Sequence, residues 1–299
     1  MKTKFCFGVR ARHSVFGGIV WVSMAGLMAA SAPAQNLYVS DSGSGNIYEF
    51  TPGGVQSTFF LGLNPAGLAF DSAGILFEAD NTGNIYKFTP GGVQSTFASG
   101  LNAPTGLAFD NAGDLFEADS GSGNIYEFTP GGAQSTFASG LNNPTGLAFD
   151  NAGNLFEADY NSGNIYEFTP GGAQSTFASG LDGIYGLAFD STGDLFAASL
   201  GFNTIFELTP GGAQSPFASG LSYPCGLAFD SAGNLFEADS SSGEINEFTP
   251  GGDQSVFASG LLNPTAVAFA PTFAPEPSTG IMLGMGFVAL LLGFHCRRN

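Results

Sequence analysis

One unit repeats along almost the whole sequence between Asn36 and Ala270. Its most regular landmark is the aspartate that closes a Gly-Leu-Ala-Phe-Asp segment. Successive copies of this aspartate are 39, 40, 40 and 40 residues apart, at Asp71, Asp110, Asp150, Asp190 and Asp230. A strict period of this size is typical of repeat architectures, in which similar units pack against their neighbours. The chain is therefore expected to fold as an array of near-identical units.

Each unit contains four short runs rich in Phe, Ile, Leu and Tyr, separated by turn residues. In one copy the runs are 146–150, 155–159, 164–168 and 174–178. Short apolar runs between turn signals predict β-strands, and the Asp-Asn-Ala-Gly and Thr-Pro-Gly-Gly links fit type I and type II turns. No run is long enough, or spaced at 3.6 residues, for a helix. The unit is predicted to be an antiparallel meander of four strands.

The two ends of the repeat region complete each other. The chain enters at Asn36-Leu-Tyr-Val-Ser-Asp41, which matches the second strand of a unit, and a first strand appears at the far end as Thr265-Ala-Val-Ala-Phe-Ala270. Third-strand segments begin at Asn46, Asn84, Asn124, Asn164, Thr204 and Glu244. Four-stranded units of this length predict an all-β, six-bladed β-propeller with four antiparallel strands per blade. Pairing of the terminal strands would close the ring and protect two sheet edges.

The unit also resembles the NHL repeat. The segments that carry the resemblance are Gly106-Leu-Ala-Phe-Asp110, Leu115-Phe-Glu-Ala-Asp119 and Asn124-Ile-Tyr-Glu-Phe128, the last departing slightly because Ile follows Asn directly. The resemblance covers residues 35–270 and implies a propeller. It does not imply one activity, because this fold hosts sensors, scaffolds and a few enzymes.

Residues 1–34 have the composition of a secretory signal peptide. A basic start with Lys2, Lys4, Arg10 and Arg12 precedes an apolar segment, 15–30, and Ala32-Pro33-Ala34 supplies small residues before a cut at Gln35. The sequence therefore predicts export across an inner membrane. An uncleaved anchor is the alternative interpretation.

The C-terminal end carries a second targeting pattern. A Pro-rich linker, 271–280, contains Pro275-Glu276-Pro277, and segment 281–299 holds an apolar run that ends in His295-Cys-Arg-Arg298. This order resembles the PEP-CTERM sorting signal of Gram-negative bacteria, which implies transient membrane insertion and processing by an exosortase-type partner. Arg297 and Arg298 are expected to stay on the cytoplasmic side of the membrane. The apolar run of 14 residues, 281–294, is shorter than the ~20 residues of an ordinary membrane span. Cleavage of the tail and permanent anchoring by it are therefore alternatives, and a helix in the propeller core is a third.

Charge is distributed unevenly along the chain. All 25 acidic residues lie between Asp41 and Glu276, with one basic residue, Lys87, so this part carries a formal charge near −24. Such a surface repels phosphate backbones, which excludes nucleic acid as a partner. Basic partners or divalent cations fit it, and so does a plain solubilising surface.

The processed domain offers little catalytic chemistry. Both histidines, His13 and His295, lie in the terminal signals, which removes His-based catalysis and His-ligated zinc. Cys225 has no basic neighbour in sequence and is expected to be an inert, buried thiol. We therefore expect a non-enzymatic binding or matrix module of the cell envelope or extracellular polymer, without a cofactor. The alternative is a divalent-metal-dependent lactonase of the gluconolactonase type.

Acidic residues recur at three positions of the unit. One set ends the second strand and could hold Ca²⁺ or hydrogen-bond its own loop amides; its members are Asp41, Asp80, Asp119, Asp159 and Asp239. The turn set that starts at Asp71 is expected to be structural. A mid-strand set has no cations nearby and must be solvated, protonated or metal-bound, and a solvated or mutually hydrogen-bonded row is the preferred interpretation; its members are Glu78, Glu117, Glu157 and Glu237.

Four aromatic residues depart from the repeat. Tyr160, Tyr185, Phe202 and Tyr223 replace small or polar residues in loops of consecutive units that should emerge on one face of the propeller. Clustered exposed aromatics can mark a recognition patch for a polysaccharide or a protein. Neutral drift among near-identical repeats is the alternative.

Overall fold

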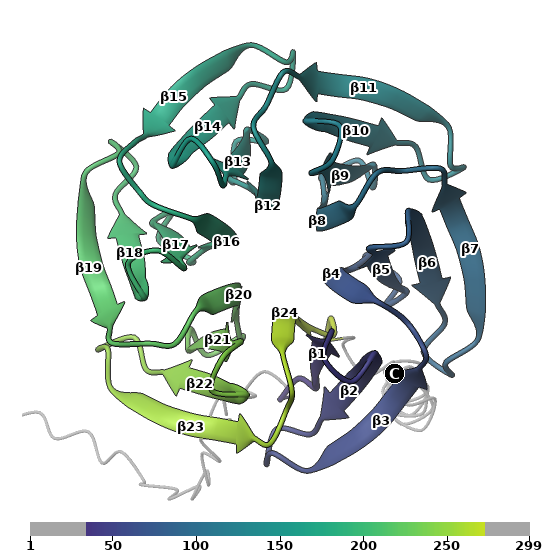
Figure 1. Cartoon of the computed structure of the whole chain (residues 1–299), viewed down its shortest axis with the longest axis vertical. Helices are drawn as coiled ribbons and strands as arrows, with labels where there is room; N and C mark the ends of the chain where they lie inside the picture. The colour runs from purple at the N-terminus through teal and green to yellow at the C-terminus, as the bar shows by residue number, and fades with distance from the viewer. Residues whose placement is uncertain (1–33, 273–299) are drawn as a thin grey trace, which may run out of the picture. The chain divides into compact units, whose positions relative to one another are not determined.

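The computed structural model describes residues 34–272, and its regular secondary structure there is entirely β-strand. The strands form six four-stranded antiparallel sheets arranged as blades around a central axis (Figure 1). No helix in the described part is long and apolar enough to cross a membrane. The predicted six-bladed β-propeller is therefore confirmed.

We label the blades A to F. Blade A contains β24 (Pro264–Phe269), β1 (Leu37–Asp41), β2 (Asn46–Phe50) and β3 (Gln56–Leu61); blade B contains β4 (Pro65–Phe70), β5 (Leu76–Asp80), β6 (Asn84–Phe88) and β7 (Gln94–Ser99). Blade C contains β8 (Pro104–Phe109), β9 (Leu115–Asp119), β10 (Asn124–Phe128) and β11 (Gln134–Ser139); blade D contains β12 (Pro144–Phe149), β13 (Leu155–Asp159), β14 (Asn164–Phe168) and β15 (Gln174–Ala178). Blade E contains β16 (Ile184–Phe189), β17 (Leu195–Ser199), β18 (Thr204–Leu208) and β19 (Gln214–Ser219); blade F contains β20 (Pro224–Phe229), β21 (Leu235–Asp239), β22 (Glu244–Phe248) and β23 (Gln254–Ser259).

Blade A joins the two ends of the repeat region. β24 pairs antiparallel with β1, with Val267 opposite Val39. Beyond the strands, the Ala270 N–H donates to the Asn36 carbonyl at 3.0 Å. Blade C has the equivalent bond, from the Asp110 N–H to the Asp114 carbonyl, but there the chain continues through the turn. Blade A therefore makes the same hydrogen bond as the other blades, although no turn connects its first and second strands.

The core consists of the contacts between neighbouring blades. At the boundary of blades C and D, Phe116 packs edge-on against Phe137 and Phe149, with ring centroids 5.0 Å apart in each case. Ala118 and Ile125 on the same face of blade C are fully buried against blade D. Because the repeat places similar residues at every boundary, each blade is stabilised by its neighbours rather than by a core of its own.

The first strands meet around the axis at backbone contact distance. A Cβ on Gly106 would lie 2.0 Å from the Thr145 carbonyl oxygen of the next blade, so only glycine fits. Thr145 Oγ1 donates across the next boundary to the Ile184 carbonyl at 3.0 Å. The Gly of each Gly-Leu-Ala-Phe-Asp segment thus sets how tightly the ring closes.

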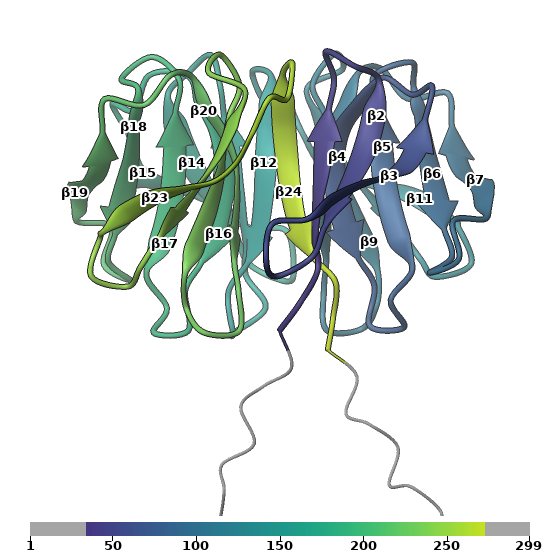
Figure 2. The ribbon, with the colours of Figure 1, turned by 90° about the horizontal axis from the view of Figure 1, so that it is seen from below.

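The propeller has two faces, which we name by their connections. The loop face carries the loops between second and third strands and the loops between blades; the turn face carries the tight turns. The described chain begins and ends on the turn face, at Ala34 and Thr272 (Figure 2). The predicted signal peptide, apart from Ala34, and the predicted sorting residues Pro275, Glu276 and Pro277 lie outside the described residues.

Candidate functional site

The loop face displays two of the four predicted aromatics prominently. Phe202 lies in the loop after β17 and is 50% exposed, and Tyr223 directly precedes β20 and is 53% exposed. Their loops are tied together, because the Tyr223 N–H donates to Asn203 Oδ1 at 3.1 Å. Phe202 also stacks edge-on with Phe206 at 6.0 Å, which limits its motion.

Tyr223 is held in an unfavourable backbone conformation. Its φ is 62°, in the left-handed region, where the equivalent residues of other blades are Ala103, Asn143 and Gly183. A bulky residue is rare at this geometry and loses roughly 1–2 kcal/mol there. The Tyr223 carbonyl is anchored by the N–H and the hydroxyl of Ser240, at 3.2 Å and 3.0 Å. Strain retained at an exposed aromatic side chain is a feature of functional sites.

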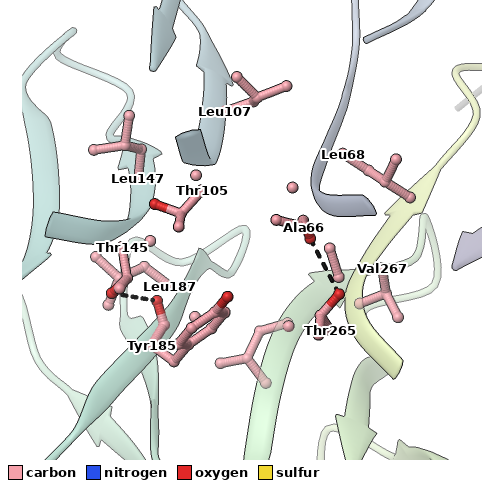
Figure 3. Close-up of a pocket in the computed structure, with 17 residues that line it drawn as sticks. Ala66, Leu68, Thr105, Leu107, Thr145, Leu147, Tyr185, Leu187, Thr265 and Val267 are labelled. Atoms are coloured by element: carbon pink, nitrogen blue, oxygen red, sulfur yellow. Dashed lines mark hydrogen bonds between the residues drawn. The ribbon is translucent and has the colours of Figure 1, made fainter. Parts of the chain in front are cut away.

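Tyr185 lies nearer the axis than the other three. It is the second residue of β16 and lines a small central cavity of about 110 Å³ (Figure 3). Burial raises the pKa of its hydroxyl above the ordinary value, and nearby Cys225 and Tyr160 raise it further. The structure therefore brings Tyr160 near Tyr185, while the loops of Phe202 and Tyr223 meet at the next blade boundary.

Leu262 is an exposed apolar residue of the loop face that the sequence interpretation missed. It lies in the loop between blades F and A, is 67% exposed, and its N–H donates to Asp41. The signal was available, since Asn102 and Asn142 occupy the same place in other units. We define the loop-face patch as Tyr160, Tyr185, Phe202 and Tyr223; Leu262 lies one blade boundary further round the ring, beside blade A.

The aspartates that end the second strands are buried and serve their own blades. Asp119 accepts from the Asn102 N–H at 2.7 Å and the Ser122 N–H at 3.0 Å, which joins the loop between blades to the loop within one. The other members make bonds of the same kind; they are Asp41, Asp80, Asp159 and Asp239. Among the described residues, no three His, Cys, Asp or Glu side chains are grouped to hold a metal ion. The hydrogen-bonding interpretation is confirmed, and Ca²⁺ binding stays a prediction.

The turn aspartates have the expected structural role. Asp150 Oδ1 accepts from the N–H groups of Ala152 and Asn154 at 2.9 Å and 2.8 Å, within its own turn. The turn is on the face opposite the patch.

The mid-strand glutamates differ from expectation. Glu78, Glu117, Glu157 and Glu237 are all 0% exposed, so the interpretation of a solvated row is wrong. They are not bonded to one another either, and among the described residues the carboxyl of Glu157 has no hydrogen-bond partner. Glu237 accepts one bond, from Asn246 Nδ2 at 2.9 Å. Burial, and then the neighbouring Asp159 carboxylate, raise the pKa of Glu157 to about 9, which keeps this side chain protonated at neutral pH.

The packing explains how these acids are buried. Leu155, Glu157 and Asp159 alternate onto the same face of β13, and Leu155 packs there in one cluster with Phe116 and Ala118 of blade C. In blades A and E, Val39 and Ala197 replace the glutamate, and both are fully buried. A glutamate is therefore tolerated at this position, not needed for folding.

The central cavity is lined by apolar and small polar residues, and Cys225 is buried. The cavity lining is made of Gly, Leu, Ala, Thr, Val and Tyr185, without a carboxylate or an imidazole among the described residues. Cys225 is buried, and burial raises the pKa of its thiol to about 12, as expected for an inert cysteine.

No family model matches the chain, and no curated protein matches it. Solved structures do. The nidogen/laminin complex matches at a TM-score of 0.73 and 22% identity, covering 80% of this chain and 100% of that one. The fold is a six-bladed β-propeller. Virginiamycin B lyase from Staphylococcus aureus matches at 0.61 and 16%, covering 79% and 91%, and a putative gluconolactonase at 0.62 and 17%, covering 77% and 92%.

At these identities the similarity concerns the fold alone. The matched proteins include a component of a protein complex, a lyase and a putative gluconolactonase, so the shared architecture does not choose between binding and catalysis. The choice depends on the side chains of this chain.

Proposed function

We propose that this protein is an exported, non-enzymatic β-propeller of the cell envelope or extracellular polymer, and that it binds a polysaccharide or protein at the loop-face patch. Tyr223 carries the proposal: it is half-exposed and held at a φ of 62° beside the loop of Phe202. Aromatic side chains displayed rigidly on a surface lose little conformational entropy on binding.

Export and sorting are part of this proposal. The signal-peptide pattern of residues 1–34 and the PEP-CTERM-like tail support transfer across the inner membrane, insertion at least transiently, and processing by an exosortase-type enzyme. The described chain ends on the turn face, at Thr272. A molecule held by its tail would present the loop face, with the patch, away from the membrane.

We assign no catalytic residues. The lactonase alternative requires a divalent metal ion in the central cavity, and the described residues that line the cavity supply no carboxylate there. Metal analysis of the purified protein, combined with a lactonase assay, decides this alternative: a tightly bound divalent ion together with turnover would replace the binding proposal.

The test of the patch is retention on isolated extracellular polymer. The variant is Phe202→Ala/Tyr223→Ala, because Tyr185 lines the cavity and its removal would also disturb packing. The matched control is Val55→Ala/Val93→Ala, two valines that are 67% exposed on the turn face. We expect retention to be lost in the first variant and kept in the control. Equal retention of both variants and the wild type would show that the patch does not bind the polymer.

The processing proposal has a separate test. Cell fractionation and mass spectrometry of the mature protein should find an N-terminus at Gln35 and a C-terminus before or within segment 281–299. A protein that keeps residues 1–34 and stays in the cytoplasm would contradict export without affecting the patch.

A further inference from the structure

The same aromatic triad lies at each blade boundary, near the turn face. At the boundary of blades E and F, Phe196 packs edge-on against Phe217 at 5.0 Å and against Phe229 at 5.1 Å. The A–B boundary has Tyr38 with Phe59 and Phe70 at 5.1 Å and 5.0 Å. The triads are therefore a sixfold feature of the ring.

At the E–F boundary the triad forms the floor of an open groove. The groove has a volume of about 450 Å³ and is lined by Phe217, Phe229, the half-buried Glu207, and the turn residues Asp190 and Asp230. This volume falls in the range of roughly 300–1,000 Å³ that is usual for ligand sites. An apolar floor beside a carboxylate suits a ligand with both an apolar stem and a positive charge.

Lys87, a side chain with an apolar stem and a positive charge, already occupies the equivalent groove of another blade. At the B–C boundary the groove measures about 510 Å³, and Lys87 stands where Glu207 stands in blade E. Its Nζ lies 5.9 Å from the ring centroid of Phe97, the counterpart of Phe217. A cation over the ring face at this distance is attracted by the ring quadrupole. The groove geometry therefore accepts an ammonium group.

Charge complementarity identifies the kind of partner. Lys87 is the one basic side chain among residues 34–272, against 24 acidic ones, which are the chain's 25 less Glu276. Four further blades carry glutamate at the Glu207 position; these are Glu49, Glu127, Glu167 and Glu247. Glu49 already accepts bonds from Asn36 and Tyr38, at 2.7 Å and 2.9 Å. Blades C, D and E thus present three consecutive glutamates beside phenylalanine triads, whereas Glu247 of blade F lies in a smaller groove of about 170 Å³ that Gln35 also lines.

We infer that the turn-face groove between blades E and F, together with the equivalent positions between blades C and D and between blades D and E, binds lysine or arginine side chains of a basic polypeptide. The methylene stem of each side chain packs on the phenyl rings, and its charge meets the ring face and the glutamate carboxylate. Neighbouring grooves can take side chains of one segment, which raises the avidity. The surface is on the face opposite the loop-face patch, so it is independent of the ligand proposed above.

Binding of a fluorescently labelled Lys₁₀ peptide, measured by anisotropy at constant ionic strength, tests this inference. The groove variant is Glu167→Lys/Glu207→Lys, which copies Lys87 and should fold like the native blade B. The control, Asp182→Lys/Glu244→Lys, has the same change in charge but lies on the loop face, with Asp182 exposed in the loop between blades D and E and Glu244 at the loop-face end of β22. We expect affinity to fall by about tenfold or more in the groove variant and by about threefold or less in the control.

A second variant tests the contribution of the Phe217 aromatic ring to binding. Phe217→Leu keeps an apolar side chain and removes the quadrupole, so we expect about two- to fivefold weaker binding of Lys₁₀. Circular dichroism and thermal melting show whether each variant is folded. An equal loss of affinity in the groove and control variants would mean diffuse attraction and would overturn the inference. Absence of Lys₁₀ binding to the wild type, or unchanged binding by Phe217→Leu, would overturn it as well.

Discussion

Replacing Glu157 by glutamine removes one of the four mid-strand glutamate carboxyl groups that the fold buries. Glu157 is 0% exposed and has no hydrogen-bond partner among the described residues. Burial and the Asp159 carboxylate raise its pKa from 4.5 to about 9. Glutamine has nearly the same shape and remains neutral at every pH, so the substitution mainly removes a titration.

The sign and size of the effect follow from proton linkage. Because the folded-state pKa lies above the unfolded value, the contribution of Glu157 to stability is complete below pH 4.5 and is lost as the pH rises towards 9. Between these limits the free energy of unfolding falls by about 1.4 kcal/mol per pH unit for this group. By pH 7 the loss reaches about 3 kcal/mol.

Urea unfolding at half-unit steps from pH 5 to pH 9 measures this loss. In Glu157→Gln, the free energy of unfolding should decline less steeply than in the wild type, by about 1.4 kcal/mol per pH unit. Gln174→Asn, at an exposed position of strand β15 in the same blade, removes no titrating group and should keep the wild-type slope. Parallel pH dependence of Glu157→Gln and the wild type would show that Glu157 is ionised in the folded state, and would refute the reasoning.

Three further predictions concern stability. In a urea titration, Gly106→Ala should lower the free energy of unfolding by about 3 kcal/mol, because its Cβ would lie 2.0 Å from a backbone oxygen. The control Gly171→Ala lies in a turn with room for a Cβ and should change the free energy of unfolding little. Tyr223→Asn should raise thermal stability by about 1 kcal/mol, since Asn143 adopts the same left-handed conformation, while it weakens polymer retention; a loss of stability would contradict the strain argument. Gln35→Ala should lower the free energy of unfolding by about 1 kcal/mol in chemical unfolding, because Gln35 Nε2 donates to the Ala270 carbonyl at 2.9 Å and Gln35 Oε1 accepts from the Ser231 N–H at 3.0 Å. Unchanged stability would show that these bonds do not hold the ring closed.

The repeat pattern was sufficient to predict the ring and its closure. Strand runs, turn residues and the split unit at 36–41 and 265–270 are local signals, and a period kept over six units leaves few ways to pack them. The structural role of Asp150 was predictable for the same reason, since its partners are two and four residues away. Sequence also located the loops of Phe202 and Tyr223.

Only the tertiary structure decided the environment of individual side chains. Glu157 was expected to be solvated or hydrogen-bonded to its counterparts, but it is fully buried on the face of β13 whose Leu155 packs in one cluster with residues of blade C. The φ of Tyr223 and the groove around Glu207 likewise arise where loops or strands of two blades meet. Local pattern determines which strands form and how they connect, because those interactions lie within one unit. Burial, strain and pKa depend on what the neighbouring unit places opposite each residue, which the order of residues in one unit does not specify.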